Sequence, residues 1–133
     1  MIFGIGTDIV EVARIEAAIN EFGDSFAKRI LAQSELASYE KSQIKPRFLA
    51  KRFAAKEAFS KALGTGLRAP CTFQNISISH DALGKPLLVL APELQAVLNG
   101  FEIAKMHLSL SDEKNLAAAF VVLETAVLET SEK

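Results

Sequence analysis

The sequence has a single cysteine, Cys71. A lone cysteine cannot form a disulfide within the chain, so the sequence predicts a protein of a reducing compartment, with Cys71 as a small core residue. The apolar N-terminus carries Asp8 and lacks a basic leader, which argues against a signal peptide. No uninterrupted apolar run approaches the roughly 20 residues that span a bilayer. We therefore expect a soluble, cytoplasmic protein with no membrane partner.

Neither sign of charge dominates, because 15 basic and 16 acidic side chains give a formal net charge of −1. This balance argues against a general nucleic-acid partner, although it does not exclude a local basic patch. Half of the 133 residues are hydrophobic, which favours a packed core over disorder. We expect one domain over residues 1–124 and a fraying C-terminal tail over residues 125–133.

Residues 1–10 alternate as a strand does, and one of the two expected faces is nearly bare. That face carries Ile2, Gly4 and Gly6, and then the carboxylate of Asp8. Because two glycines weaken a strand, we expect something to approach the backbone closely there. Asp8 is expected at the end of the strand.

The rest of the first half predicts helices. Apolar spacing predicts a helix over residues 11–22, ending near Gly23, and shorter ones over residues 26–31 and after Ser34. Pro46 suits the first position of a long helix, residues 47–63 contain no breaker, and Gly64-Thr65-Gly66 marks the end of this helix. It is apolar on every side, so we expect it to be buried or covered by a partner subunit.

The second half predicts strands. Residues 73–80 and 87–90 flank turn residues and indicate a hairpin, residues 92–98 a short helix, and residues 106–111 and 116–123 two further strands. A helix-rich half followed by a hairpin-rich half is typical of an α+β fold with an antiparallel sheet, here with a long central helix.

Two acidic residues are candidates for chemistry. Asp8 fits either an N-cap of the helix that follows or an exposed metal ligand. Glu57 lies on a mostly apolar stripe of the long helix and fits either an ion pair with Lys61 or a cation site. A surface pair contributes only about 0.2–0.5 kcal/mol. That gain would not offset the burial of a carboxylate, so a buried Glu57 needs a stronger partner.

Lys61 and the Gly64-Thr65-Gly66 segment fit a phosphate site, since lysine supplies a point charge and glycines expose backbone N–H groups. The spacing is not that of a Walker motif, and a plain helix end with a surface lysine is the alternative. His107 shares a strand face with two serines, and a lone histidine is usually structural. Magnesium prefers oxygen ligands, which argues against the histidines as metal ligands.

Four segments of the chain, taken in order, form a recognisable set: GIGTDIVEVARIE (residues 4–16), RFAAKEAFSKALGTG (52–66), GKP (84–86) and HLSLSD (107–112). Together they resemble holo-acyl carrier protein synthase, the small bacterial class of phosphopantetheinyl transferase. The second segment is the most specific. Together they span nearly the whole predicted domain, so the resemblance implies the 4′-phosphopantetheinyl transferase fold.

The resemblance implies transfer of 4′-phosphopantetheine from coenzyme A to a serine of apo-acyl carrier protein, for fatty acid biosynthesis, with release of adenosine 3′,5′-bisphosphate. It implies that Asp8 and Glu57 hold Mg²⁺ at the coenzyme A diphosphate and that Lys61 contacts the phosphate. The other residues that it places around coenzyme A are Arg52, Gly64, Thr65, Gly66, Lys85, Pro86 and His107. Glu57, a metal-bound water and His107 are all candidates for the general base.

The resemblance also implies a homotrimer with active sites between subunits, and Arg14 as a residue that docks the acidic carrier protein. Here the sequence departs from the family, because Glu16, Glu21 and Asp24 stand where more basic residues are expected. Lys28, Arg29 and Arg47 are candidates to compensate. Two other functions use similar residues: a magnesium-dependent nucleotide-diphosphate hydrolase, which usually needs a denser acidic helix, and an inactive carrier-protein-binding module.

Overall fold

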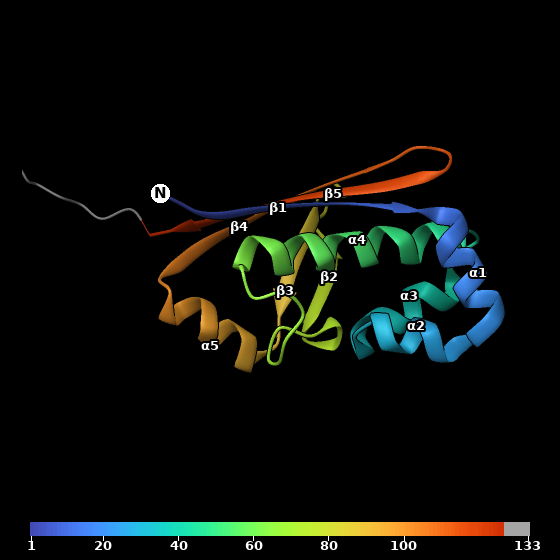
Figure 1. Cartoon of the computed structure of the whole chain (residues 1–133), viewed down its shortest axis with the longest axis horizontal. Helices are drawn as coiled ribbons and strands as arrows, with labels where there is room; N and C mark the ends of the chain where they lie inside the picture. Colours follow the sequence, from blue (N-terminus) through green and yellow to red (C-terminus); the bar gives the residue numbers. More distant parts are fainter. Residues whose placement is uncertain (127–133) are drawn as a thin grey trace, which may run out of the picture.

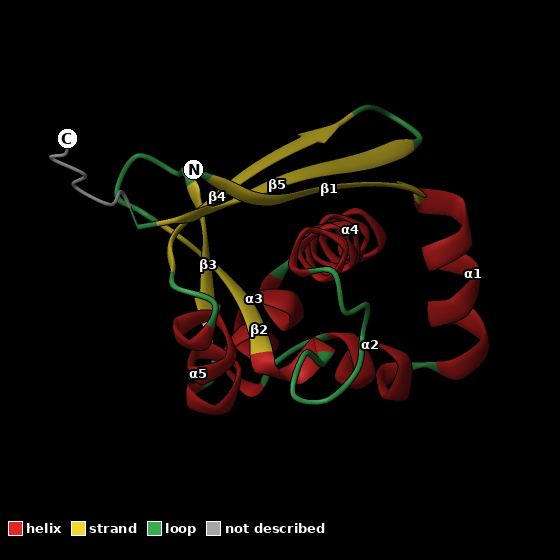
Figure 2. Cartoon of the chain, turned by 60° about the vertical axis from the view of Figure 1, so that its left-hand side comes forward, coloured by secondary structure: helices red, strands yellow, loops and turns green. Residues whose placement is uncertain are grey.

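The computed structural model describes residues 1–126. A three-stranded antiparallel sheet in the order β1-β5-β4 lies on the long helix α4, and β2 pairs with β3 in a separate two-stranded sheet (Figure 1). The predicted α+β class, with an antiparallel sheet and a long central helix, is confirmed. Figure 2 shows α4 nearly end-on beneath the sheet, with α1 on one side and the β2–β3 hairpin and α5 on the other.

The elements follow the order expected from the sequence, with shifted ends. The strands are β1 (Ile2–Glu11), β2 (Ile76–His80), β3 (Pro86–Leu90), β4 (Ile103–Asp112) and β5 (Leu116–Thr125). The helices are α1 (Val12–Phe22), α2 (Asp24–Ile30), α3 (Leu36–Lys41), α4 (Lys45–Leu63) and α5 (Pro92–Gly100), with 3₁₀ turns at Gln33–Glu35 and Phe73–Asn75.

The bare face of β1 lies against α4, as the two glycines predict. A Cβ atom added to Gly6 would stand 2.0 Å from the carbonyl oxygen of Ala58, and one added to Gly4 would stand 2.0 Å from that of Ala62. Neither distance is physically allowed. The element that approaches the strand is therefore the helix itself, and only glycine permits this separation.

The helix α4 is covered within a single chain, which corrects one of the two expectations for it. Its small side chains Ala50, Ala54, Ala55 and Ala58 are fully buried, and Phe59 lies among them. The sheet covers one side of the helix and α1, α2 and β2 border the others. The apolar character of α4 therefore carries no argument for a partner subunit.

Two local predictions about Asp8 are wrong. The strand continues to Glu11, so Asp8 lies within β1, opposite Ala119 of β5, and not at its end. Glu11, not Asp8, occupies the N-cap of α1, and its side chain makes no capping hydrogen bond. The carboxylate of Asp8 is thus free of the capping role that the sequence allowed.

The far end of the chain is tied to its beginning. The backbone N–H of Thr125 donates to the carbonyl oxygen of Met1 at 2.8 Å, so β5 extends one residue past the expected domain boundary. Residues 127–133 lie outside the described residues, and the fraying of the tail stays a prediction. Within residues 1–126, none of the helices is both long and apolar enough to cross a membrane.

A buried network of charged side chains, which the sequence did not suggest, joins α4 to the 3₁₀ turn at Gln33–Glu35, to α2 and to β2. Both carboxylate oxygens of Glu35 accept hydrogen bonds: Oε1 from Lys56 Nζ (2.6 Å) and the backbone N–H of Ala32 (2.8 Å), and Oε2 from Arg52 (2.8 Å) and the N–H of Ile78 (2.9 Å). Glu35 is 2% exposed and Lys56 is fully buried. One carboxylate therefore compensates two buried cations.

The network is complete around Lys56 as well. Its ammonium also donates to the carbonyl oxygen of Ile30 (2.7 Å), at the C-terminal end of α2, and to that of Phe73 (3.0 Å), in the 3₁₀ turn before β2. Burial lowers the pKa of Lys56 to about 8, although the charge of Glu35 opposes this. For Glu35, burial acts to raise the pKa, but the charge and hydrogen bond of Lys56, together with the hydrogen bonds from Ala32 and Arg52, lower it.

Replacement of Gly6 by alanine is expected to destabilise the fold by about 1–3 kcal/mol, because the new Cβ forces β1 away from Ala58. Gly100→Ala is the matched control, since a Cβ there meets no atom within 4 Å. Urea unfolding of both variants measures the difference. Equal stability of the two would mean that β1 does not rest on α4 as described.

Glu35→Gln is expected to cost about 3–5 kcal/mol, because it keeps the shape but leaves Arg52 and Lys56 buried without a counter-charge. The control is Glu40→Gln, an exposed carboxylate on the neighbouring helix α3. The free energies of unfolding of both variants, from urea titrations, test this. A loss below about 1 kcal/mol for Glu35→Gln would contradict the account of the network.

Candidate active site

Asp8 meets α4 through Lys61. The ammonium of Lys61 lies 3.1 Å from Asp8 Oδ1 and donates to the carbonyl oxygen of Thr7 at 2.9 Å. The Asp8 side chain is 17% exposed and that of Lys61 is 52% exposed. Lys61 therefore holds its charge beside the carboxylate from the solvent side. This geometry contradicts the ion pair of Lys61 with Glu57 that the helical spacing suggested.

Glu57 lies one helical turn before Lys61 and lines the same cleft as Asp8. This cleft, of about 470 Å³, runs between β1, α1, α2 and α4. Burial raises the pKa of Glu57, and the negative charge of Asp8 raises it further, while Lys61 acts in the opposite direction. The two carboxylates are thus close enough for their charges to interact, and one lysine does not fully compensate them.

The donor set of this cleft fits magnesium. Within the described residues no group of three or more histidine, cysteine, aspartate or glutamate side chains could hold a metal ion. Two carboxylates, however, are what Mg²⁺ commonly takes from a protein when substrate phosphates complete its shell. The uncompensated charge of Asp8 and Glu57 favours a cation at this point.

The remaining walls of the cleft are apolar, except for one arginine. Arg14 of α1 lines it together with the apolar residues Ile15, Ala18, Phe26 and Phe53. The predicted docking residue and the two carboxylates therefore share one cleft. The aromatic lining was not predicted, because Phe26 and Phe53 read in sequence only as core residues.

The glycines after Lys61 close the helix. The N–H groups of Gly64 and Gly66 both donate to the carbonyl oxygen of Ser60, at 3.0 and 3.3 Å, and Gly64 adopts a φ of 91°. Two of the backbone donors that the sequence offered to a phosphate are thus used within the protein. Gly64 and Thr65 line a second cavity, at the C-terminal end of α4.

Arg52 is engaged inside the protein. Besides Glu35, it donates to the carbonyl oxygen of Ile78 at 2.7 Å, and its guanidinium lies 4.4 Å from the ring centroid of Phe48. These contacts fix β2 to α4. Its predicted contact with coenzyme A stays a prediction, and the residues that hold it, Glu35 and Ile78, were not foreseen because they come from distant segments.

His107 lies on the outer face of the sheet. It is directly opposite Val122, which is opposite Ile5, and such residues share a face. Its Nε2 lies 2.6 Å from Glu124 Oε1. Asp8 faces α4 on the other side of the sheet, so one chain does not bring His107 to Asp8.

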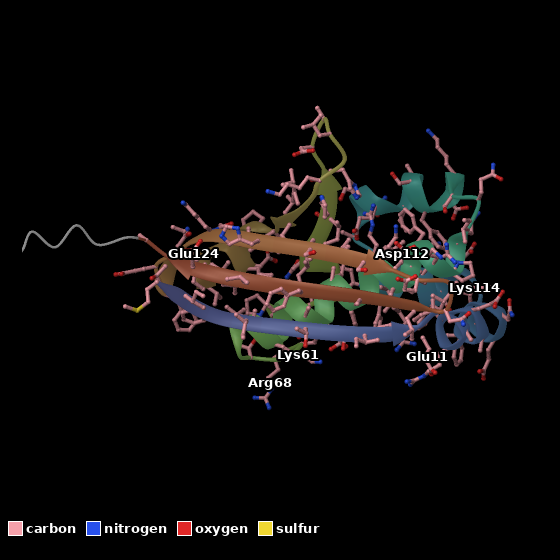
Figure 3. All side chains as sticks on the ribbon, turned by 90° about the horizontal axis from the view of Figure 1, so that it is seen from above. Glu11, Lys61, Arg68, Asp112, Lys114 and Glu124 are labelled. Atoms are coloured by element: carbon pink, nitrogen blue, oxygen red, sulfur yellow. The ribbon has the colours of Figure 1, made fainter. Side chains whose placement is uncertain are left out.

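Lys85 and Pro86 are also distant from Asp8 within one chain. The turn that carries Lys85 is held by Asp81, whose Oδ1 accepts from the N–H groups of Leu83 and Lys85, both at 2.9 Å. Figure 3 shows this turn projecting beyond β4, whereas Lys61 projects beyond β1 at the opposite edge of the sheet.

The basic residues near the cleft are fewer than expected. Lys28 and Arg29 are exposed in the last turn of α2. Arg47, the third candidate to compensate for the acidic α1, lies 3.6 Å from Asp112 and donates to the carbonyl oxygen of Lys114 at 3.1 Å. Its charge is therefore partly used within the protein.

Comparison with known proteins gives one family throughout. Residues 4–121 match the model of the 4′-phosphopantetheinyl transferase superfamily. The holo-[acyl-carrier-protein] synthase of Nitrosospira multiformis is 51% identical over 124 residues, which are 93% of this chain and 99% of that protein.

Solved structures agree. The synthase of Neisseria meningitidis has a TM-score of 0.92 at 50% identity, covering 94% of this chain and 100% of that one. The synthase of Bacillus anthracis, in complex with CoA (3′,5′-ADP), has a TM-score of 0.79 at 41% identity, covering 95% and 99%. With its cleft, its fold and these matches in agreement, the chain belongs to the 4′-phosphopantetheinyl transferase superfamily.

Proposed function

We propose that this protein transfers 4′-phosphopantetheine from coenzyme A to a serine of an acyl carrier protein, for fatty acid biosynthesis, and releases adenosine 3′,5′-bisphosphate. The observation that carries the proposal is the cleft in which Asp8 of β1 and Glu57 of α4 lie together beside Lys61. The Bacillus anthracis relative with the same fold was solved with CoA (3′,5′-ADP).

Asp8 and Glu57 would hold Mg²⁺, which supplies positive charge that neutralises the diphosphate oxygens during transfer. Lys61 adds a fixed ammonium at the same place, because two oxygens of β1 orient it. Phosphoryl transfer depends mainly on positioning and on charge compensation. The close contact of β1 with α4 at the glycines positions the side chains that supply these charges.

Glu57 is our choice for the base that accepts the serine proton. It lines the cleft beside Asp8, where a carboxylate oxygen that does not bind the metal would accept the proton. His107 of the same chain faces away from this cleft.

Arg14 borders the cleft, and Lys28 and Arg29 lie nearby on α2, so an acidic carrier protein would dock over α1 and α2.

The protein would act as a homotrimer with sites between subunits. Apolar side chains are exposed on the outer face of the sheet, with Ile5 57%, Ile9 68%, Leu116 41% and Phe120 43% exposed. The Asp8–Lys61 edge and the β2–β3 turn lie at opposite edges (Figure 3), so a head-to-tail ring would bring Lys85 and Pro86 of one subunit to the Asp8 of the next. A cytoplasmic location agrees with the free, buried Cys71.

Asp8→Ala and Glu57→Ala are each expected to lower turnover by at least about 100-fold while the protein stays folded, because each removes half of the cation site. Glu40→Ala, at an exposed position of α3, is the control. Intact mass of an apo-carrier protein incubated with coenzyme A and Mg²⁺ reports the transfer. Full activity of either variant would refute the two-carboxylate site.

The same assay separates the alternatives. A wild-type protein that gives no mass gain with Mg²⁺ present is not a transferase of this kind. Release of free phosphopantetheine without carrier protein would indicate a nucleotide-diphosphate hydrolase, and metal-independent binding of coenzyme A without turnover would indicate an inactive binding module.

Subunit complementation tests the intersubunit site. Asp8→Ala and Lys85→Ala proteins are each expected to be impaired, but co-expressed mixed oligomers should recover part of the wild-type activity, because some sites then combine two intact halves. Co-expression of Asp8→Ala with Glu57→Ala is the control, since both changes affect the same half. Equal activity of the two mixtures would contradict a site shared between subunits.

A further inference from the structure

The ammonium of Lys61 occupies one of the two carboxylates proposed for the metal. It lies 3.1 Å from Asp8 Oδ1 and donates to the carbonyl oxygen of Thr7 at 2.9 Å. A divalent cation bound to Asp8 would stand close to this ammonium, and like charges at short range repel each other strongly where water is partly excluded. In the free protein, Lys61 and a divalent cation therefore compete for the same carboxylate.

Of these two partners, the lysine is the one that can move. Asp8 is fixed within β1 and its side chain is only 17% exposed, whereas that of Lys61 is 52% exposed. The base of the lysine is packed, since a Cβ atom added to Gly6 would stand 3.0 Å from the Cβ of Lys61. Its charged end faces solvent at the edge of β1 (Figure 3). An ion pair that is half open to solvent is weak, so another anion can replace Asp8 as the partner of Lys61.

The exchange does not require Lys61 to leave the site. An ammonium carries three N–H donors, and the carbonyl oxygen of Thr7 accepts one of them while Asp8 accepts another. The hydrogen bond to Thr7 can stay in place while the donor that points at Asp8 turns to a diphosphate oxygen. One lysine can thus neutralise Asp8 in the free protein and a diphosphate in the complex.

The charges of the cleft favour such an exchange. Burial and the charge of Asp8 raise the pKa of Glu57 and Lys61 acts in the opposite direction, so the three groups interact. Asp8 and Glu57 supply two negative charges, and Lys61 and Arg14 supply two positive charges. A divalent cation alone would leave the cleft with an excess of two positive charges. The diphosphate of coenzyme A carries two negative charges and removes this excess, so metal and diphosphate are expected to bind together.

Resting on the proposed function, we propose that Lys61 is an exchangeable counter-ion of Asp8. Without substrate it neutralises Asp8 and disfavours the binding of free divalent cations. With substrate its ammonium pairs with the diphosphate and leaves Asp8 to the metal. Metal and coenzyme A therefore bind with positive cooperativity, which is reciprocal, and Lys61 carries part of this coupling.

Titration with Mn²⁺ in the absence of coenzyme A tests the inference, with free Mn²⁺ measured by electron paramagnetic resonance, because Mn²⁺ accepts the same oxygen ligands as Mg²⁺. Lys61→Met keeps an unbranched stem beside Gly6 but removes the charge, and it should bind Mn²⁺ at least about tenfold more tightly than the wild type. Lys61→Gln should do the same. Lys41→Met, at an exposed position in the last turn of α3, changes the net charge equally and should match the wild type. Coenzyme A should tighten Mn²⁺ binding to the wild type by at least about tenfold, and to Lys61→Met by less.

Folded Lys61→Met and Lys61→Gln proteins that bind Mn²⁺ no more tightly than Lys41→Met does would overturn the inference. So would a wild-type protein whose Mn²⁺ affinity is unchanged by coenzyme A, a result that needs no variant. A gain in Lys61→Met that persists when Asp8→Ala is added also contradicts it, because the ion then lies elsewhere. Failure of the proposed function is distinguished by the mass assay with carrier protein, since Mn²⁺ binding is measured without any transfer.

Discussion

The contact between the backbone of β1 and the backbone of α4 is the constraint on which the rest of this structure depends. Gly4 and Gly6 leave no space between the strand and the helix carbonyl groups of Ala62 and Ala58. Since Asp8 follows on the same face of β1 and Glu57 precedes Ala58 on α4, this contact also sets the distance between the two carboxylates. In the proposed mechanism, packing and catalysis thus depend on the same contact.

Much of this frame could be predicted from sequence, because it is encoded locally. Alternation and two bare positions predicted a strand with a close neighbour, and a breaker-free stretch before Gly64 predicted α4. The partner of Lys61 could not be predicted in this way. Helical spacing offers it only Glu57, whereas the structure supplies Asp8 from 53 residues away. Tertiary contact overrode a weak local pair.

The Glu35 network could not be predicted either, because it too depends on tertiary contacts. Glu35, Arg52, Lys56 and Ile78 belong to separate segments, and no periodic pattern joins them before the chain folds. Once formed, the network fixes the β2–β3 hairpin and the end of α2 to α4. The β2–β3 hairpin and the α2 part of the proposed docking surface are therefore held to the same helix that carries Glu57.

Alternate residues of β1 lie on opposite faces of the sheet. The inner face contacts α4 and carries Asp8, and the outer face carries Ile5 and Ile9. A slip of one position against β5 would exchange these faces, turning Asp8 outward and pressing Ile5 and Ile9 onto α4. No branched side chain fits where even a methyl group has no room. Gly4 and Gly6 thus fix the register of β1 against β5, because the shifted pairing would produce steric clashes with α4.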